Sequence, residues 1–303
     1  MDPESAANID QHVDRLLRAS GAYGRFPTPL EDIVAQQKLS QSLPEDSPLA
    51  PGNLQRAPTE LRRRLQSLLA KAQAILDRRE RVIHVVPSHL EVKKRFGTAH
   101  EVVHDLLPHH RDLYYVDGPH QLDPKTDHIL EREANYGASS ILFQLREFTN
   151  RAREFRPGMA VPIDLGELFG ASIHAAFRQY IETHLDSVGG LVMARSPFCD
   201  EHDTSQYVFL VEQVFASQSF ARLFPWLGDS LRTLATQDHP GLASAWDQLS
   251  RAGRQLAADE MLIPSHDGTS TRVHIELFTN TYHLFLFMHA LRRFDMRNTV
   301  RLV

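Results

Sequence analysis

Apolar residues recur through the first part of the chain at the three- and four-residue spacing that is typical of amphipathic helices. This spacing predicts helices over residues 8–20, just after Pro27, and over 61–76. Between 41 and 58 it gives way to polar residues and four prolines, a composition typical of an extended linker. We therefore expect residues 1–58 to form an N-terminal helical arm and a Pro-rich linker.

The middle of the chain combines one short strand with longer helices. A β-branched run at 82–86 predicts a strand, and a one-sided apolar pattern predicts a helix from about 88 that ends at Pro108. Residues 109–126 have the composition of a loop, and the next helix is predicted from about 125 to 155. A helix, a short strand and a second helix thus precede the loop.

Two further segments complete the chain. Residues 162–184 have the pattern of two short helices around Gly170, as in a helix-turn-helix. Beyond residue 188 the apolar pattern predicts strands at 189–194, 206–215, 272–278 and 282–288, and helices at 220–234 and 242–258.

The helix predicted before Pro108 carries the sequence HEVVH at residues 100–104, an instance of His-Glu-x-x-His. Residues four apart project from one face of a helix, so His100 and His104 can offer two imidazole nitrogens to one zinc ion. Glu101 lies one step around the helix, where it can act as general base on a metal-bound water instead of binding the metal. The chain has 17 His, so the motif depends on its helical context, which is present here.

A third ligand is expected from the next predicted helix, in the run EREAN at 131–135. Glu133 shares a helix face with apolar and small residues, and a buried carboxylate needs a partner such as a metal. Glu131 has the simpler interpretation of a solvated side chain. We therefore predict a zinc site made of His100, His104 and Glu133, with an open fourth position for water.

An alternative third ligand, His110, lies closer in the sequence. It follows His104 at the spacing of the third metzincin ligand, and Met159 could supply the Met-turn of that class. The metzincin motif has Gly at the position of Leu107, because the chain turns there in the left-handed region. A Leu in that region costs about 1–2 kcal/mol, which disfavours this interpretation.

Three runs resemble the ImmA/IrrE family of zinc metallopeptidases over roughly residues 60–185: FGTAHEVVHDLL at 96–107, EREANYGA at 131–138 and ASIHAAFRQYIE at 171–182. The resemblance implies a zincin fold in which the two motif histidines and the Glu of the Glu-Ala-Asn run, Glu133, bind zinc and Glu101 is the base. It implies a protein substrate, typically a helix-turn-helix transcriptional repressor. Members of this family that respond to DNA damage carry a GAF-like sensor domain at their C-terminus.

We therefore expect an α+β fold that is mainly helical. The predicted boundaries are 1–58 for the arm and linker, 59–160 for a zincin-like metallopeptidase domain, 161–187 for a helical hairpin of helix-turn-helix type, and 188–303 for a C-terminal α/β domain. The last would be a regulatory domain and, by the resemblance, GAF-like.

Charge and composition narrow the classes of partner. The net charge of −5 gives no general attraction to nucleic acid or anionic membranes, and the helical hairpin has few basic residues, so we do not expect DNA binding. No apolar run is long enough for a membrane span, and the N-terminus lacks a signal-peptide pattern. The single cysteine, Cys199, excludes an intrachain disulfide and fits a reducing compartment, so we expect a cytoplasmic protein.

These observations favour a zinc-dependent endopeptidase that cleaves a partner protein by Glu-assisted attack of a zinc-bound water. The alternative is a non-catalytic zincin-like regulatory protein that binds a protein partner or DNA. Intact ligands and an intact Glu101 argue against that alternative.

Overall fold

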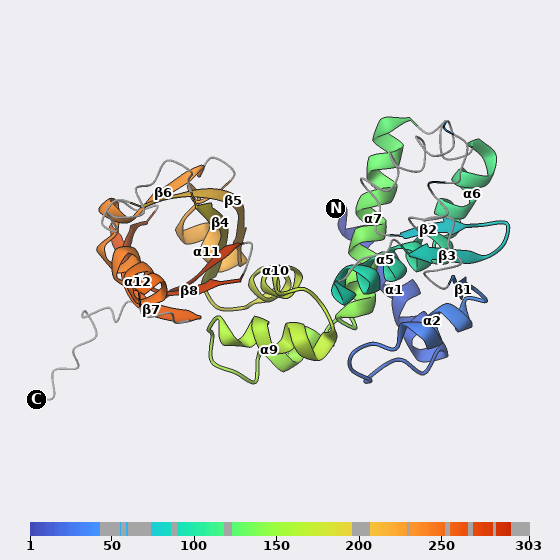
Figure 1. Cartoon of the computed structure of the whole chain (residues 1–303), viewed down its shortest axis with the longest axis horizontal. Helices are drawn as coiled ribbons and strands as arrows, with labels where there is room; N and C mark the ends of the chain where they lie inside the picture. The colour runs from blue at the N-terminus through green and yellow to red at the C-terminus, as the bar shows by residue number, and fades with distance from the viewer. Residues whose placement is uncertain are drawn as a thin grey trace, which may run out of the picture. The chain divides into compact units, whose positions relative to one another are not determined.

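The computed structural model describes residues 1–42, 55, 59, 74–85, 90–117, 123–195, 207–228, 231–251, 255–265, 269–280 and 283–291. The chain divides into two compact units (Figure 1). The first comprises Met1–Arg151 and Asp164–Ala175, and the second comprises Ala152–Ile163 and Ala176–Val303. Most of the predicted Pro-rich linker, and most of the helix predicted at 61–76, lie outside the described residues.

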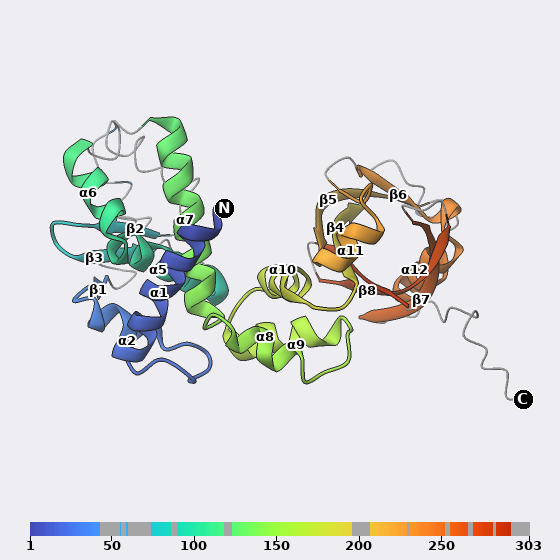
Figure 2. The same ribbon diagram turned by 180° about the vertical axis from the view of Figure 1, so that it is seen from behind.

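Helices from both ends of the first unit share one hydrophobic core. They are α1 (Pro3–Ala19), α2 (Leu30–Gln36), α5 (Glu91–Leu106) and α7 (Pro124–Leu142). Helices α6 (Pro108–Asp117) and α8 (Glu147–Ala152) follow α5 and α7 along the chain. Helix α1 begins where the Asp2 carboxylate accepts hydrogen bonds from backbone N–H groups of the first turn. Its buried stripe, with Val13 and Leu17, lies in the same core as Val103 of α5. The segment that we predicted as an N-terminal arm thus belongs to this core, and α1 lies beside α7 (Figure 2).

A three-stranded sheet packs against α5 in the order β1-β3-β2. Its strands are β1 (Ser40–Gln41), β2 (Ala74–Asp77) and β3 (Val82–Val85), with β1 parallel and β2 antiparallel to β3. Strand β3 confirms the strand predicted at 82–86. Ile75 and Leu76 lie in β2, so their assignment to the preceding helix was wrong. A short apolar run fits both the helical and the strand spacing, and here pairing with His84 and Ile83 decides it.

Helix α5 is followed at once by another helix. Leu107 adopts an extended conformation with φ −85° and ψ 119°, and α6 begins at Pro108. The prediction of a loop from residue 109 was therefore wrong for the first part of that segment. Proline stops a helix but also suits the first position of the next one, because its fixed φ is helical and its missing N–H would have had no partner there.

Helix α7 begins as predicted and ends earlier than predicted. Asp123 caps it by accepting the Lys125 N–H at 3.2 Å, and Pro124 occupies its first position. Gln144 and Leu145 then have φ of 47° and 58°, which breaks the single helix predicted to residue 155, and α8 restarts at Glu147. The sequence pattern could not show this turn, because a tertiary contact stabilises it.

That contact is the buried side chain of Gln144. Its amide donates to the backbone carbonyls of Ala22 at 3.2 Å and Arg25 at 2.7 Å, and its oxygen accepts the Gly24 N–H at 2.7 Å. The loop between α1 and α2 is thereby joined to the end of α7. These hydrogen bonds, with one more from the amide nitrogen to Thr28 Oγ1 at 3.1 Å, offset the cost of the left-handed backbone at this turn.

The hairpin predicted at 162–184 is confirmed as two helices, α9 (Ala160–Phe169) and α10 (Ile173–Thr183), separated by Gly170 at φ +63°. The second unit contains a six-stranded antiparallel sheet of order β6-β5-β4-β9-β8-β7, strongly curled in Figures 1 and 2. Its elements are β4 (Val188–Arg195), β5 (Val208–Ala216), α11 (Gln218–Leu223), β6 (Thr233–Ala235), α12 (Pro240–Arg251), β7 (Leu256–Pro264), β8 (Ser270–Thr279) and β9 (Leu284–Ala290).

The chain is therefore a mixed α/β protein, as expected, and the four predicted C-terminal strands are present. The two predicted helices of this region are shorter than expected, because residues 233–235 form β6 and residues 256–264 form β7. In β7 the buried residues alternate with exposed ones, which is the spacing of a strand. No helix in the described part of the chain is both long and apolar enough to cross a membrane.

The crossing of α5 and α7 generates a test of packing. A Cβ added to Gly137 would lie 2.8 Å from both Cγ atoms of Val103 and 3.2 Å from Ile9 Cγ2. Ala is the better helix former by about 1 kcal/mol, but overpacking of a core costs about 1–3 kcal/mol. We expect Gly137→Ala to lower the free energy of unfolding, measured by thermal or denaturant unfolding.

The matched control combines Gly137→Ala with Val103→Ala, which removes the two methyl groups in the way. The loss in the double variant should be smaller than the sum of the single losses, since the two positions share one contact. A Gly137→Ala protein that is more stable than the parent would contradict the close packing of the two helices.

Candidate metal centre

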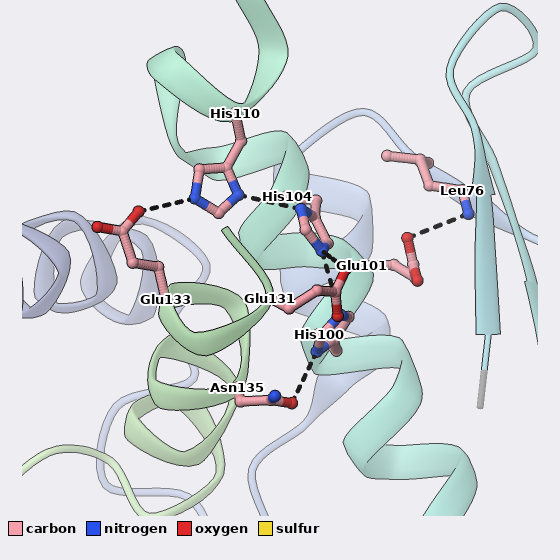
Figure 3. A network of polar contacts seen from close by, with 8 residues as sticks. All are labelled: Leu76, His100, Glu101, His104, His110, Glu131, Glu133 and Asn135. Carbon is pink, nitrogen blue, oxygen red and sulfur yellow. Dashed lines mark hydrogen bonds and ion pairs between the residues drawn. The ribbon is translucent and has the colours of Figure 1, made fainter. Parts of the chain in front are cut away.

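Two histidines of α5 and a glutamate of α7 bring three potential ligand groups together (Figure 3). His100 Nε2 lies 3.1 Å from His104 Nε2, and Glu131 carboxylate oxygens lie 3.3 Å from the first nitrogen and 3.5 Å from the second. A tetrahedral zinc with ligands at about 2.0–2.1 Å has neighbouring ligand atoms about 3.3 Å apart. The three separations are therefore close to those of a zinc site, with Oε2 of Glu131 nearest His100 and Oε1 nearest His104.

The charges of this group favour a cation. Hydrogen bonds to His100 and His104 lower the pKa of Glu131 well below its ordinary value, so its carboxylate stays ionised. Burial acts to lower the pKa of His100, but the hydrogen bond to Glu131 and the nearby carboxylates outweigh it and raise this pKa. His104 is buried, whereas the Glu131 side chain is 44% exposed, so the group is open to solvent on the α7 side.

Asn135 orients the first histidine. Its Oδ1 lies 3.1 Å from His100 Nδ1 (Figure 3), and it follows Glu131 by one helical turn, so both side chains face α5. An amide oxygen can only accept a hydrogen bond, so it holds a proton on His100 Nδ1 and leaves the lone pair of Nε2 for a metal. Our sequence analysis missed both α7 residues, although a Glu and an Asn four apart in EREAN were the available signal.

A second group of potential ligands lies at the start of α6. His109 Nε2 and His110 Nε2 lie 2.7 and 3.0 Å from Oε2 of Glu133. Burial lowers the pKa of His110 to about 4, against the raising effect of Glu133. Burial raises the pKa of Glu133, but its hydrogen bonds to the two histidines outweigh burial and lower it. The other ring nitrogen of His110, Nδ1, lies 3.0 Å from His104 Nδ1, so the two groups are joined.

Of the residues predicted for the zinc site, the structure brings His100 and His104 together but places Glu133 in the second group. Successive residues of a helix are about 100° apart, so Glu133 projects about 200° around α7 from Glu131. The face of α7 that Glu133 shares with Tyr136 is turned toward α1, where Tyr136 donates a hydrogen bond to Asp10 at 3.1 Å. The buried position that we predicted for Glu133 is present, but the partners of its carboxylate are His109 and His110.

The metzincin arrangement would bring His110 to the same metal as His104. Instead, His110 approaches the Nδ1 side of the His104 ring, opposite the nitrogen that meets Glu131. Leu107 is extended and does not make the left-handed turn that this arrangement needs. His110 therefore lies on the side of the His104 ring that faces away from Glu131 and His100.

Glu101 points away from the three ligand groups and toward β2 (Figure 3). Its Oε2 accepts the backbone N–H of Leu76 at 3.1 Å, and within the described residues its other oxygen accepts no hydrogen bond. Burial raises the pKa of Glu101, against the lowering effect of His104 and His100. A carboxylate with a raised pKa and an oxygen that remains available has the properties of a general base.

One protein-family model matches part of this chain. Residues 61–178 match the family model Peptidase_M78, described as the IrrE N-terminal-like domain. No curated protein matches the chain. Among solved structures, a Mycobacterium tuberculosis transcriptional regulator matches at a TM-score of 0.49 and 14% identity, over 94% of this chain and 76% of that chain. The match over residues 61–178 includes both groups of histidines and glutamates, and the chain therefore carries a domain of the ImmA/IrrE family.

Proposed function

We propose that this protein is a zinc-dependent endopeptidase in which His100, His104 and Glu131 hold the metal and Glu101 is the general base. The observation that carries the proposal is the convergence of two imidazole Nε2 atoms and a carboxylate at separations of 3.1, 3.3 and 3.5 Å. The match to the Peptidase_M78 family model supports a peptidase site at this position.

A zinc ion bound by these residues would supply a Lewis acid that lowers the pKa of a coordinated water to about 7. Side chains of the protein perform the remaining steps. Asn135 holds the proton of His100 on Nδ1, so that Nε2 faces the metal. Glu101, which would have to turn from Leu76 of β2 toward the metal, takes a proton from the attacking water and returns it to the leaving amine of the cleaved peptide bond.

Strand β2 supports a protein as the substrate. In the described three-stranded sheet, β2 has β3 as its only neighbour and packs beside α5, and its Leu76 N–H turns toward the site. An extended peptide can pair with such an edge and be held across the metal. By the family resemblance, we propose a helix-turn-helix transcriptional repressor as the partner that is cleaved.

The second unit would then act as the regulatory part of the chain. We propose the GAF-like architecture for it, which the single antiparallel sheet of six strands supports. We do not propose DNA binding by the α9–α10 hairpin. Arg178, a basic residue of α10, forms an ion pair with Glu182 of the same helix at 3.0 Å.

The identity of the third ligand can be tested with a matched pair of variants on α7. Glu131→Gln should lose most of the metal, because an amide is a weak ligand and the site loses its negative charge. Glu133→Gln should still copurify with about one zinc per chain. Elemental analysis of the two purified proteins measures this directly. The opposite result, metal lost from Glu133→Gln and retained by Glu131→Gln, would restore the ligand set predicted from the sequence.

The second test concerns Glu101. Glu101→Gln should retain its zinc, because Glu101 is not among the three ligand groups, and should lose cleavage by about 10²–10⁴-fold. The measurement is the intact mass of a helix-turn-helix repressor that is co-expressed with this protein, together with metal content. Cleavage at the parent rate by the metal-loaded variant would refute the mechanism. If the metal-loaded parent leaves every candidate partner intact, the non-catalytic alternative is supported.

A further inference from the structure

Two buried side chains that connect to the metal group, His110 and Glu133, have no role in the mechanism. His110 is fully buried, and Glu133 is only 7% exposed. They form a short series of contacts that ends at the metal group: Glu133 Oε2 to His110 Nε2 at 3.0 Å, then His110 Nδ1 to His104 Nδ1 at 3.0 Å (Figure 3). Buried polar groups are costly unless they are hydrogen-bonded, so the direction of each bond matters.

The Glu133 carboxylate determines the direction of both hydrogen bonds. An ionised carboxylate only accepts, so the nitrogen of His110 that faces Glu133 must carry the proton. The His110 ring is fully buried and shares Glu133 with His109, conditions that favour a neutral ring. A neutral ring with a proton on Nε2 has a lone pair on Nδ1. His104 must then donate from its own Nδ1 and, when its ring is neutral, has its lone pair on Nε2.

We propose that His110 and Glu133 are positioning residues that fix the tautomer and ring orientation of His104, so that its Nε2 is presented to the metal. This inference rests on the proposed metal site and extends it. Asn135 holds the tautomer of His100 in the same way, by a direct contact. For His104 the same control is exerted through a second imidazole, with Glu133 as the final acceptor.

The same hydrogen bonds argue against a second metal ion among His109, His110 and Glu133. Coordination through His110 Nε2 would move the proton of His110 to Nδ1, which would then donate to His104 Nδ1. The proton of a neutral His104 would have to lie on Nε2, and that nitrogen could no longer bind the first metal. The contact of 2.7 Å between His109 and Glu133 is also shorter than the roughly 3.3 Å expected between ligands of one tetrahedral ion.

The first experiment detects the tautomer directly. Imidazole ¹⁵N shifts of ¹⁵N-His-labelled protein distinguish protonated from unprotonated ring nitrogens, and a His104→Asn variant assigns the signals. In metal-free parent protein at about pH 9, where an ordinary His is neutral, we expect the proton of His104 on Nδ1. In Glu133→Gln, whose amide no longer requires a donor, a fraction of His104 should change to the Nε2–H form. A parent protein with His104 in the Nε2–H form would overturn the inference.

The second experiment measures zinc affinity by competition with a chelator. His110→Leu removes the acceptor of His104 and should weaken zinc binding by roughly 10–100-fold. His110→Asn keeps an acceptor close to the position of Nδ1 and should recover most of that affinity. His109→Gln is the matched control on the neighbouring residue, whose side chain is 48% exposed, and should bind zinc like the parent.

The outcomes separate this inference from the proposed function. If the parent binds no zinc, the proposed metal site fails, while the tautomer of His104 still tests the positioning role in the metal-free protein. If the parent binds zinc and His110→Leu binds it equally well, the positioning role fails and the metal site stands. Two tightly bound zinc ions per chain, with one lost in both His110→Leu and Glu133→Gln, would show a second metal site and overturn the inference.

Discussion

The close packing of α5 against α7 is the constraint on which the rest of the metal group depends. At the crossing, Gly137 provides no side chain, and Val103 fills the space that results. This approach brings a carboxylate of one helix within 3.5 Å of two imidazoles on the other. A spacing set by a valine side chain packed directly on a glycine leaves little freedom of movement, and metal ligands need such rigidity because small displacements change the coordination geometry.

Helix α7 supplies three polar side chains within little more than one turn, and each has a different task. Glu131 and Asn135 project from the same face and meet His100, one as a potential ligand and the other as a hydrogen-bond acceptor. Glu133 projects from the other side of the helix and meets the start of α6. The EREAN run therefore reaches both histidines of α5 directly through Glu131, and it reaches His104 a second time through Glu133 and His110.

The helical positions of His100, His104 and Glu101 could be predicted, because the motif and its helix are local features of the sequence. The choice between Glu131 and Glu133 as the third ligand could not be made from local features of the sequence. Both lie on one predicted helix, and the sequence does not reveal which face meets α5 and which meets α1. The turn at Gln144 and the strand at 256–264 were missed for a similar reason. The turn depends on a contact with residues 22–25, and the strand depends on pairing with β8.

Helix α1 has a consequence for how the protein can be divided. The family match begins at residue 61, yet α1 covers α7 with apolar side chains, and Asp10 accepts hydrogen bonds from Tyr136 and Ser140. A fragment that began at residue 61 would expose the side of α7 that those groups now cover and would leave two of its polar side chains without their acceptor. The stretch of sequence shared with relatives is thus smaller than the piece of chain that must fold together.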